Sequence, residues 1–106
     1  DKVTRPTKMR TRRRGEIIEV LCVVNHPMET GQRVDGKTNR RIPAHYIQKM
    51  VFKLNGQQVA VADTGTGLSR RPLIAVRLKG TETGDTISVN WTDNMGESGS
   101  ANTTIA

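Results

Sequence analysis

Ile17-Ile18-Glu19-Val20-Leu21-Cys22-Val23-Val24 is the stretch of sequence that decides the fold. From Ile18 to Val24, every second residue is β-branched or is the small Cys22, and this pattern predicts a strand with a buried inward face. Leu21 and Val23 fall on the opposite face of the same strand. That face is unusually apolar for one that meets water, so we expect another protein chain to cover it.

The same two-residue period recurs along the rest of the chain. Asn55-Gly56 comes directly after one of the alternating runs and is the strongest short-range signal for a β-hairpin. No window has the period of an amphipathic helix. The alternating runs lie at residues 47–54, 59–61, 74–78 and 87–92, with loops at 63–72 and 93–96 and a polar tail that is able to return as a last strand.

Short strands at this spacing predict one all-β domain over residues 1–106. Six or seven strands in about 100 residues are typical of the immunoglobulin-like antiparallel β-sandwich, so we expect about seven strands in that arrangement. A five-stranded barrel is the structural alternative. Within the domain, residues 1–14 are expected to form a basic N-terminal strand or arm.

The charge of the chain narrows the class of partner. Lys and Arg number 17 against 10 Asp and Glu, a net charge of +7, which favours acidic or anionic partners. Seven of the cations lie within residues 1–14, so a small nucleic-acid-binding β-domain is the alternative function. Single-strand binders add aromatic stacking platforms, but Tyr46, Phe52 and Trp91 all lie outside this stretch. We therefore expect no nucleic-acid partner.

The single cysteine, Cys22, excludes an intramolecular disulfide and a cysteine-rich zinc site. We expect Cys22 to be a small buried core residue, because a reactive thiol needs an exposed, electropositive setting. No apolar run approaches the roughly 20 residues of a membrane helix, so no membrane association is expected. No secretion signal is visible. The chain begins with Asp1 rather than Met, so the sequence is also compatible with a leader peptide that has been removed.

The sequence contains no pattern of a known catalytic site. It lacks a nucleophile elbow, a metalloprotease helix, a P-loop and a dinucleotide fingerprint. Gly65-Thr66-Gly67 is predicted to be a connection between strands, because no helix follows to present its N-terminus to a phosphate. We therefore expect neither enzymatic activity nor a cofactor.

The densest group of functional side chains is His26-Pro27-Met28-Glu29-Thr30-Gly31-Gln32-Arg33, directly after the first strand. Turn formation explains the proline and the glycine, but it does not require the other residue types together. One imidazole and one thioether make an incomplete shell for a soft metal, so no metal site is expected here. A recognition loop is the preferred interpretation. The candidate partner-binding residues are Leu21, Val23, His26, Met28, Gln32 and Arg33.

Three stretches of the chain, in this order, resemble the SoxZ family. They span most of residues 15–96, and the segment at residues 26–33 is the specific one. The stretches are Gly15-Glu16-Ile17-Ile18 leading into residues 26–33, then Ile42-Pro43 with residues 47–56, and then Asn90-Trp91-Thr92-Asp93-Asn94-Met95-Gly96.

The resemblance implies an immunoglobulin-like fold and a non-catalytic subunit of the SoxYZ carrier in thiosulfate oxidation. SoxY is then an obligate heterodimer partner and carries the sulfur intermediate on a cysteine in a glycine-rich arm. Transient contacts with the other Sox enzymes and a periplasmic location, reached by export together with SoxY, are also implied. Residues 98–106 contain no cysteine, as expected of SoxZ rather than SoxY. We expect Arg33 to contact anionic sulfur groups because of its charge.

Overall fold

The computed structural model describes residues 5–63 and 71–105, and within these ranges the chain forms strands and no helix. No helix long and apolar enough to cross a membrane therefore occurs in the described ranges. The all-β prediction and the number of strands are confirmed. The strands are β1 (Thr7–Arg14), β2 (Ile17–Val24), β3 (Ile47–Leu54), β4 (Gln57–Asp63), β5 (Leu73–Lys79), β6 (Thr86–Asp93) and β7 (Ser98–Thr104).

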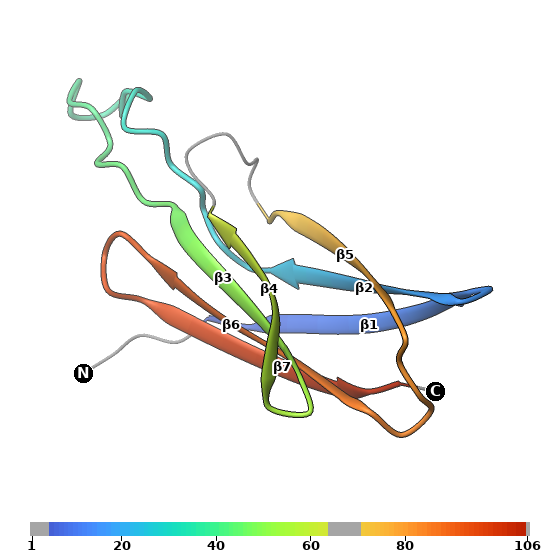
Figure 1. Cartoon of the computed structure of the whole chain (residues 1–106). Coiled ribbons are helices and arrows are strands. Elements are labelled where there is room, and N and C mark those ends of the chain that lie inside the picture. Colours follow the sequence, from blue (N-terminus) through green and yellow to red (C-terminus); the bar gives the residue numbers. More distant parts are fainter. Residues whose placement is uncertain (1–4, 64–70, 106) are drawn as a thin grey trace.

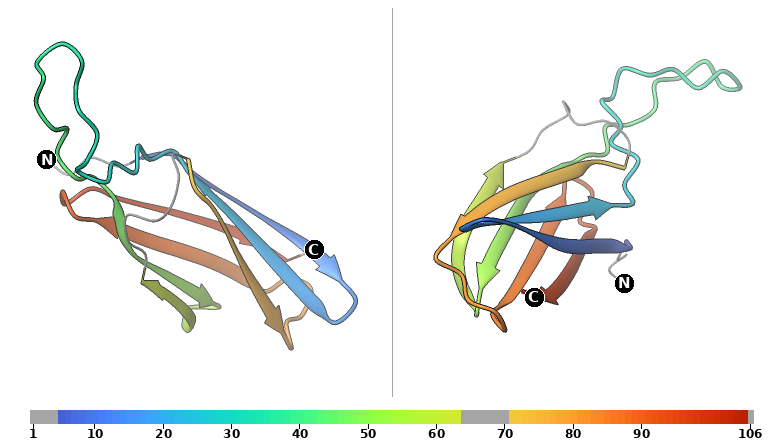
Figure 2. Two further views of the ribbon diagram at one scale, coloured as in Figure 1. Left: turned by 90° about the horizontal axis from the view of Figure 1, so that it is seen from above. Right: turned by 90° about the vertical axis from the view of Figure 1, so that its right-hand side faces the viewer.

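The strands form two antiparallel sheets that pack face to face (Figure 1). One sheet has the order β1-β2-β5 and the other has the order β4-β3-β6-β7. This is the predicted sandwich rather than a single closed barrel. The segment at residues 25–46 joins the two sheets and extends beyond one end of the sandwich in both views of Figure 2.

Side chains alternate along β2 as its sequence predicts. Ile18, Val20, Cys22 and Val24 are each at most 1% exposed, whereas Val23 on the other face is 39% exposed. The hairpin signal is also confirmed, since β3 and β4 are joined by Asn55 and Gly56 alone. Both residues have positive φ, +51° and +84°, as a two-residue turn of type I′ requires. Most of the predicted loop at 63–72, including Gly65-Thr66-Gly67, lies outside the described residues.

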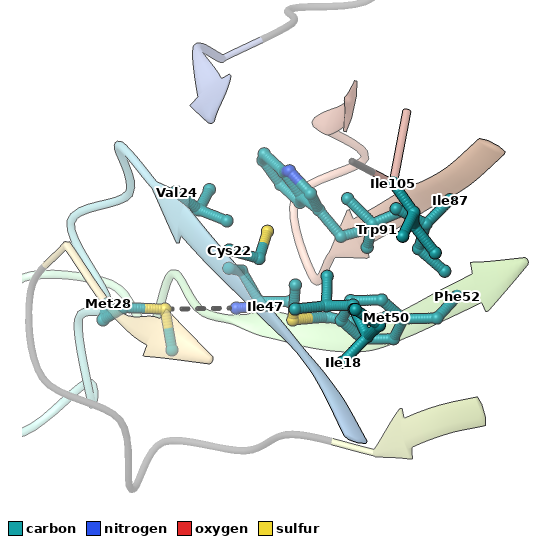
Figure 3. Packing of buried hydrophobic residues seen from close by; sticks show 12 residues of the cluster. Ile18, Cys22, Val24, Met28, Ile47, Met50, Phe52, Ile87, Trp91 and Ile105 are labelled. Atoms are coloured by element: carbon teal, nitrogen blue, oxygen red, sulfur yellow. Dashed lines mark hydrogen bonds between the residues drawn. The ribbon is translucent and has the colours of Figure 1, made fainter. Parts of the chain in front are cut away.

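The core lies between the two sheets, and Figure 3 shows side chains from β2 and β3 meeting those of β6. Trp91 and Phe52 are its largest fully buried side chains. The indole Nε1–H of Trp91 donates to the Thr7 hydroxyl at 2.8 Å, which ties β6 to β1 across the sandwich. The ring packs against the backbone of Gly99 on β7. A Cβ added at Gly99 would lie 2.5 Å from Trp91 Nε1 and 2.7 Å from Thr7 Oγ1.

Gly99→Ala is therefore expected to displace the indole and break its hydrogen bond. Overpacking of this kind costs about 2–3 kcal/mol, measurable as a lower free energy of unfolding in urea. Fluorescence follows the affected site directly because Trp91 is the one tryptophan in the sequence. The control is Gly36→Ala, where an added Cβ meets nothing within 4 Å. Equal stability of the two variants would contradict this packing.

Cys22 is fully buried, as predicted, and burial raises the pKa of its thiol to about 11. Because the thiolate is the reactive form, the native protein should react with a thiol reagent at pH 8 far more slowly than the urea-unfolded chain. Fast native labelling at pH 8 would contradict a buried thiol. Raising the pH toward 11 should speed native labelling, since the thiolate fraction then increases.

Candidate functional site

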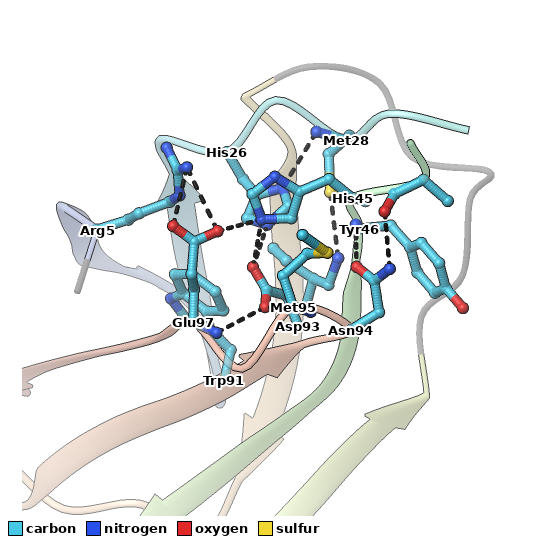
Figure 4. Close-up of polar contacts among 12 residues, drawn as sticks. Arg5, His26, Met28, His45, Tyr46, Trp91, Asp93, Asn94, Met95 and Glu97 are labelled. Carbon is cyan, nitrogen blue, oxygen red and sulfur yellow. Dashed lines mark hydrogen bonds and ion pairs between the residues drawn. The ribbon is translucent and has the colours of Figure 1, made fainter. Parts of the chain in front are cut away.

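The candidate functional site lies at the end of the sandwich from which the segment at residues 25–46 extends. Three parts of the chain meet there: the residues after β2, the residues before β3, and the β6–β7 turn (Figure 4). Glu29 and His45 exchange two backbone hydrogen bonds of 2.6 and 2.9 Å, which close the base of the segment. The side chain of Asn94 then pairs with the backbone of Tyr46 and Ala44, each at 2.8 Å. These bonds fix the turn against the base of the segment.

Asp93 is the centre of the site, and its carboxylate is fully buried. Oδ1 accepts the backbone N–H groups of Met95 at 2.9 Å and Glu97 at 2.8 Å. Oδ2 lies 2.9 Å from His26 Nε2 and 2.7 Å from His45 Nε2. One carboxylate therefore holds its own turn with one oxygen and the two histidines with the other.

The hydrogen bonds of His26 determine its tautomer. Its Nδ1 accepts the backbone N–H of Met28 at 3.1 Å, so the ring proton lies on Nε2 and is donated to Asp93. Burial, reinforced by the proximity of His45 and Arg5, lowers the pKa of His26 despite the opposing carboxylate of Asp93. The ring is neutral, 1% exposed, and packed edge-on against Trp91 with the ring centres 5.5 Å apart.

His45 lies at the rim of the site, with 17% of its side chain exposed. Its Nε2 faces two carboxylates, Oδ2 of Asp93 and Oε2 of Glu97. Arg5 pairs with the other oxygen of Glu97, Oε1, at 3.0 Å, and also donates to Oε2 at 3.4 Å. Burial acts to raise the pKa of Asp93, but the N–H donors of His26, Glu97 and His45 outweigh it and hold that pKa below its ordinary value.

The structure separates the sequence-predicted residues into three groups. Leu21 and Val23 lie on the outer face of the three-stranded sheet, in a shallow groove that Leu73 also lines. His26 and Met28 are interior side chains, 1% and 5% exposed, and do not line an open surface. Met28 has a φ of +50°, and its sulfur accepts the N–H of Ile47 at 3.5 Å. Both residues hold the end of the sandwich together.

Gln32 and Arg33 form the third group, on the exposed part of the segment. The Arg33 guanidinium donates to both oxygens of Glu29, with the shortest contact 2.6 Å, and this bonding raises the pKa of Arg33. Its side chain remains 59% exposed. The ion pair with Glu29 thus holds Arg33 at the surface, so its side chain does not extend freely into solvent.

Sequence reasoning missed His45, Glu97 and Arg5 as members of the site. Asp93 begins the loop predicted at residues 93–96, where an Asp side chain typically caps its own turn; this accounts for Oδ1 but leaves out Oδ2. One signal was available: His26 and His45 are the only histidines in the sequence, and they lie at the two ends of one long connection. A closed connection brings its ends together, so the two rings were candidates to meet.

The fold and the site define a class: a small immunoglobulin-like β-sandwich closed at one end by a buried cluster of two imidazoles and a carboxylate. The family model described as "Sulphur oxidation protein SoxZ" matches residues 7–104. The chain therefore belongs to the SoxZ family and is a subunit of the Sox sulfur-oxidation system. The predicted resemblance is confirmed. No match was found among curated protein sequences.

Solved structures with this fold are distant in sequence. A superoxide reductase in the oxidised state is 15% identical with a TM-score of 0.68, covering 96% of this chain and 88% of its own. A hypothetical protein from Pyrococcus horikoshii is 13% identical with a TM-score of 0.66, covering 96% and 89%. The reduced superoxide reductase (neelaredoxin) from Archaeoglobus fulgidus is 16% identical with a TM-score of 0.60, covering 100% and 91%. At this identity the likeness concerns the fold alone.

Asp93→Asn tests whether the buried carboxylate holds the site together. The variant keeps the size of the side chain, but its NH₂ group would replace an oxygen that now accepts from two imidazole nitrogens. Loss of acceptors for buried donors costs about 2–3 kcal/mol, measurable by urea unfolding at pH 7. The control is Asp35→Asn, whose remaining oxygen still accepts the Lys37 N–H. A change below about 0.5 kcal/mol for Asp93→Asn, the range of neutral surface substitutions, would show that the network contributes little.

Proposed function

We propose that this chain is the non-catalytic subunit of a SoxYZ carrier heterodimer, and that SoxY binds the outer face of the β1-β2-β5 sheet. In this role the chain stabilises SoxY and helps present its cysteine-bearing arm to the other Sox enzymes, in the periplasm and after joint export. Membership of the SoxZ family supports the Sox system as the setting. The observation that carries the docking face is the division of that face into an apolar half and a basic half.

The apolar half lies at the end of the face nearer the candidate site. Val23 pairs with Leu73 on β5, and Leu21 pairs with Ala75. Leu73 is 61% exposed and Val23 39% exposed, which is unusual for large apolar side chains. Lys8 and Arg10 on β1 border them, opposite Val23 and Leu21. An apolar patch with a polar rim is typical of a protein-binding surface.

The basic half lies toward the β1–β2 turn. Register places Arg12 and Arg77 on either side of Glu19, and Arg14 and Lys79 on either side of Ile17. Glu19 is the single acid among the strand residues of this face, and the hydrogen bond from Arg12 lowers its pKa. The face therefore carries a strong positive field. A partner that offers acidic side chains beside an apolar patch matches both halves.

The exposed part of the segment at residues 25–46 supplies a second contact in this proposal. The segment extends from the end of the molecule at which β2 ends and β5 begins (Figure 1), and Gln32 and Arg33 are exposed residues of it. The side chain of Arg33 remains accessible to solvent although its guanidinium binds Glu29. An anionic sulfur group on the SoxY arm is the kind of ligand that such a cation binds.

Leu21→Glu tests the docking face. A carboxylate in the middle of the apolar half would have to be desolvated on binding, so the affinity for SoxY should fall by at least about 100-fold. The measurement is co-purification with SoxY, followed by titration calorimetry in 0.5 M NaCl. The wild-type heterodimer should persist at that salt concentration, because apolar contact is not screened.

The matched control is Val61→Glu on the outer face of the other sheet. Val61 is 39% exposed, equal to Val23. We expect Val61→Glu to bind SoxY like the wild type. If Val61→Glu abolishes binding and Leu21→Glu does not, SoxY docks on the four-stranded sheet and the assigned face is wrong. If the wild-type chain and SoxY form no complex, the heterodimer itself is refuted.

A further inference from the structure

Four side chains with metal-binding atoms converge at the closed end of the sandwich (Figure 4). One atom from each of His26, His45, Asp93 and Glu97 lies within 4.8 Å of all the others. They come from three separate parts of the sequence, since Asp93 and Glu97 flank the same turn. Imidazole nitrogen and carboxylate oxygen together are the donors that zinc and similar divalent transition metals bind.

Proton placement decides which of the four can be ligands. His26 uses the lone pair of Nδ1 to accept the Met28 N–H, so its Nε2 carries a proton and is a donor to Asp93. A metal bound to that Nε2 would require the ring proton to lie on Nδ1. The Nδ1 proton would then point at the backbone N–H of Met28, and the hydrogen bond between them would be lost. His26 is therefore a positioning residue that orients the carboxylate of Asp93 from behind, as outer-shell partners do in metal sites.

The other three side chains present one atom each to a common point. Asp93 has Oδ1 anchored by two backbone N–H groups, which leaves Oδ2 directed at His45. Glu97 has Oε1 anchored by Arg5 at 3.0 Å, and its Oε2, which Arg5 contacts only at 3.4 Å, is directed at the same nitrogen. A single N–H on His45 Nε2 cannot give a full hydrogen bond to both carboxylates. A divalent cation in place of that proton interacts with both.

Access and charge are consistent with a cation at this point. The His45 and Glu97 side chains are 17% and 12% exposed, so the point is reached from solvent, while Asp93 closes the back of it. The two carboxylates carry two negative charges, and Arg5 is the nearby cation paired with one of them. The cluster thus retains an excess negative charge on a protein that is otherwise strongly basic.

We propose that His45 Nε2, Asp93 Oδ2 and Glu97 Oε2 bind one divalent transition-metal ion of the Zn²⁺ type, with solvent completing its coordination. On binding, the His45 ring exchanges its Nε2 proton through water for a proton on Nδ1, so the ring stays neutral and the Nε2 lone pair bonds to the metal. Three protein ligands leave one tetrahedral position open. This site differs from the His26 and Met28 pairing considered from the sequence, because the Met28 sulfur is occupied by the Ile47 N–H. The proposal does not depend on SoxY.

The test uses the untagged full chain after removal of metals by chelation. Titration with Co²⁺ should give the visible absorption of a low-coordinate Co²⁺ site, with one ion per chain, and calorimetry with Zn²⁺ should give the same stoichiometry. Histidine ¹⁵N NMR of the wild type identifies the ligand: Zn²⁺ should shift Nε2 of His45 and leave the Nε2–H of His26 in place. This readout needs no variant to fold.

The variants are His45→Gln and Glu97→Gln, each of which should weaken Zn²⁺ binding by about ten-fold or more. The control is Glu16→Gln, an exposed acid outside the site, which should bind like the wild type. Absence of Co²⁺ absorption at a ten-fold excess of metal would overturn the proposal. So would metal binding that persists unchanged in both variants, or an NMR response confined to His26.

Discussion

The carboxylate of Asp93 is the constraint on which the closed end of this sandwich depends. It accepts two backbone N–H groups within its own turn and faces two imidazole N–H groups from elsewhere in the chain. A fully buried carboxylate is tolerated only when its lone pairs are used. Four donors meet that requirement here, and the fully buried His26 depends on the carboxylate in return. Removal of the carboxylate would leave the buried N–H of His26 unpaired, so the β6–β7 turn and both ends of the segment at residues 25–46 are held together through Asp93.

The sequence predicted the sandwich well because its strands carry local signals. Alternation in β2 identified its buried face residue by residue, and Asn55-Gly56 identified the β3–β4 hairpin. The closed end carries no such signal, because His26, His45 and Asp93 meet only after three connections have folded. Local reasoning placed Asp93 in a turn and assigned it a local role. That role describes Oδ1 only. Oδ2 contacts His45 and His26, which lie 48 and 67 residues away in the sequence.

The interpretation of residues 26–33 changes for the same reason. A cluster of polar residues after a strand was predicted to be a recognition loop, yet His26 and Met28 are interior and only its later residues are exposed. The segment combines two physical tasks. Its first residues bury polar atoms against β6 and β3, and this anchoring fixes the direction in which Gln32 and Arg33 project. Composition alone cannot separate these tasks, because histidine, methionine and arginine occur in interior anchors as well as in recognition loops.

The closed end and the proposed docking face are connected through the backbone that leaves the site. The carbonyl of His26 accepts the N–H of Arg71, and Val24 N–H donates to the carbonyl of Pro72. These bonds place Leu73, the most exposed apolar residue of the docking face, next to Val23 at the start of β5. The position of Leu73 therefore depends on where His26 is held, and His26 is held by Asp93. A cation bound by Asp93 would be linked to the start of β5 by this series of contacts, through His26 and Arg71. The two proposed sites are separate in chemistry but share one rigid support.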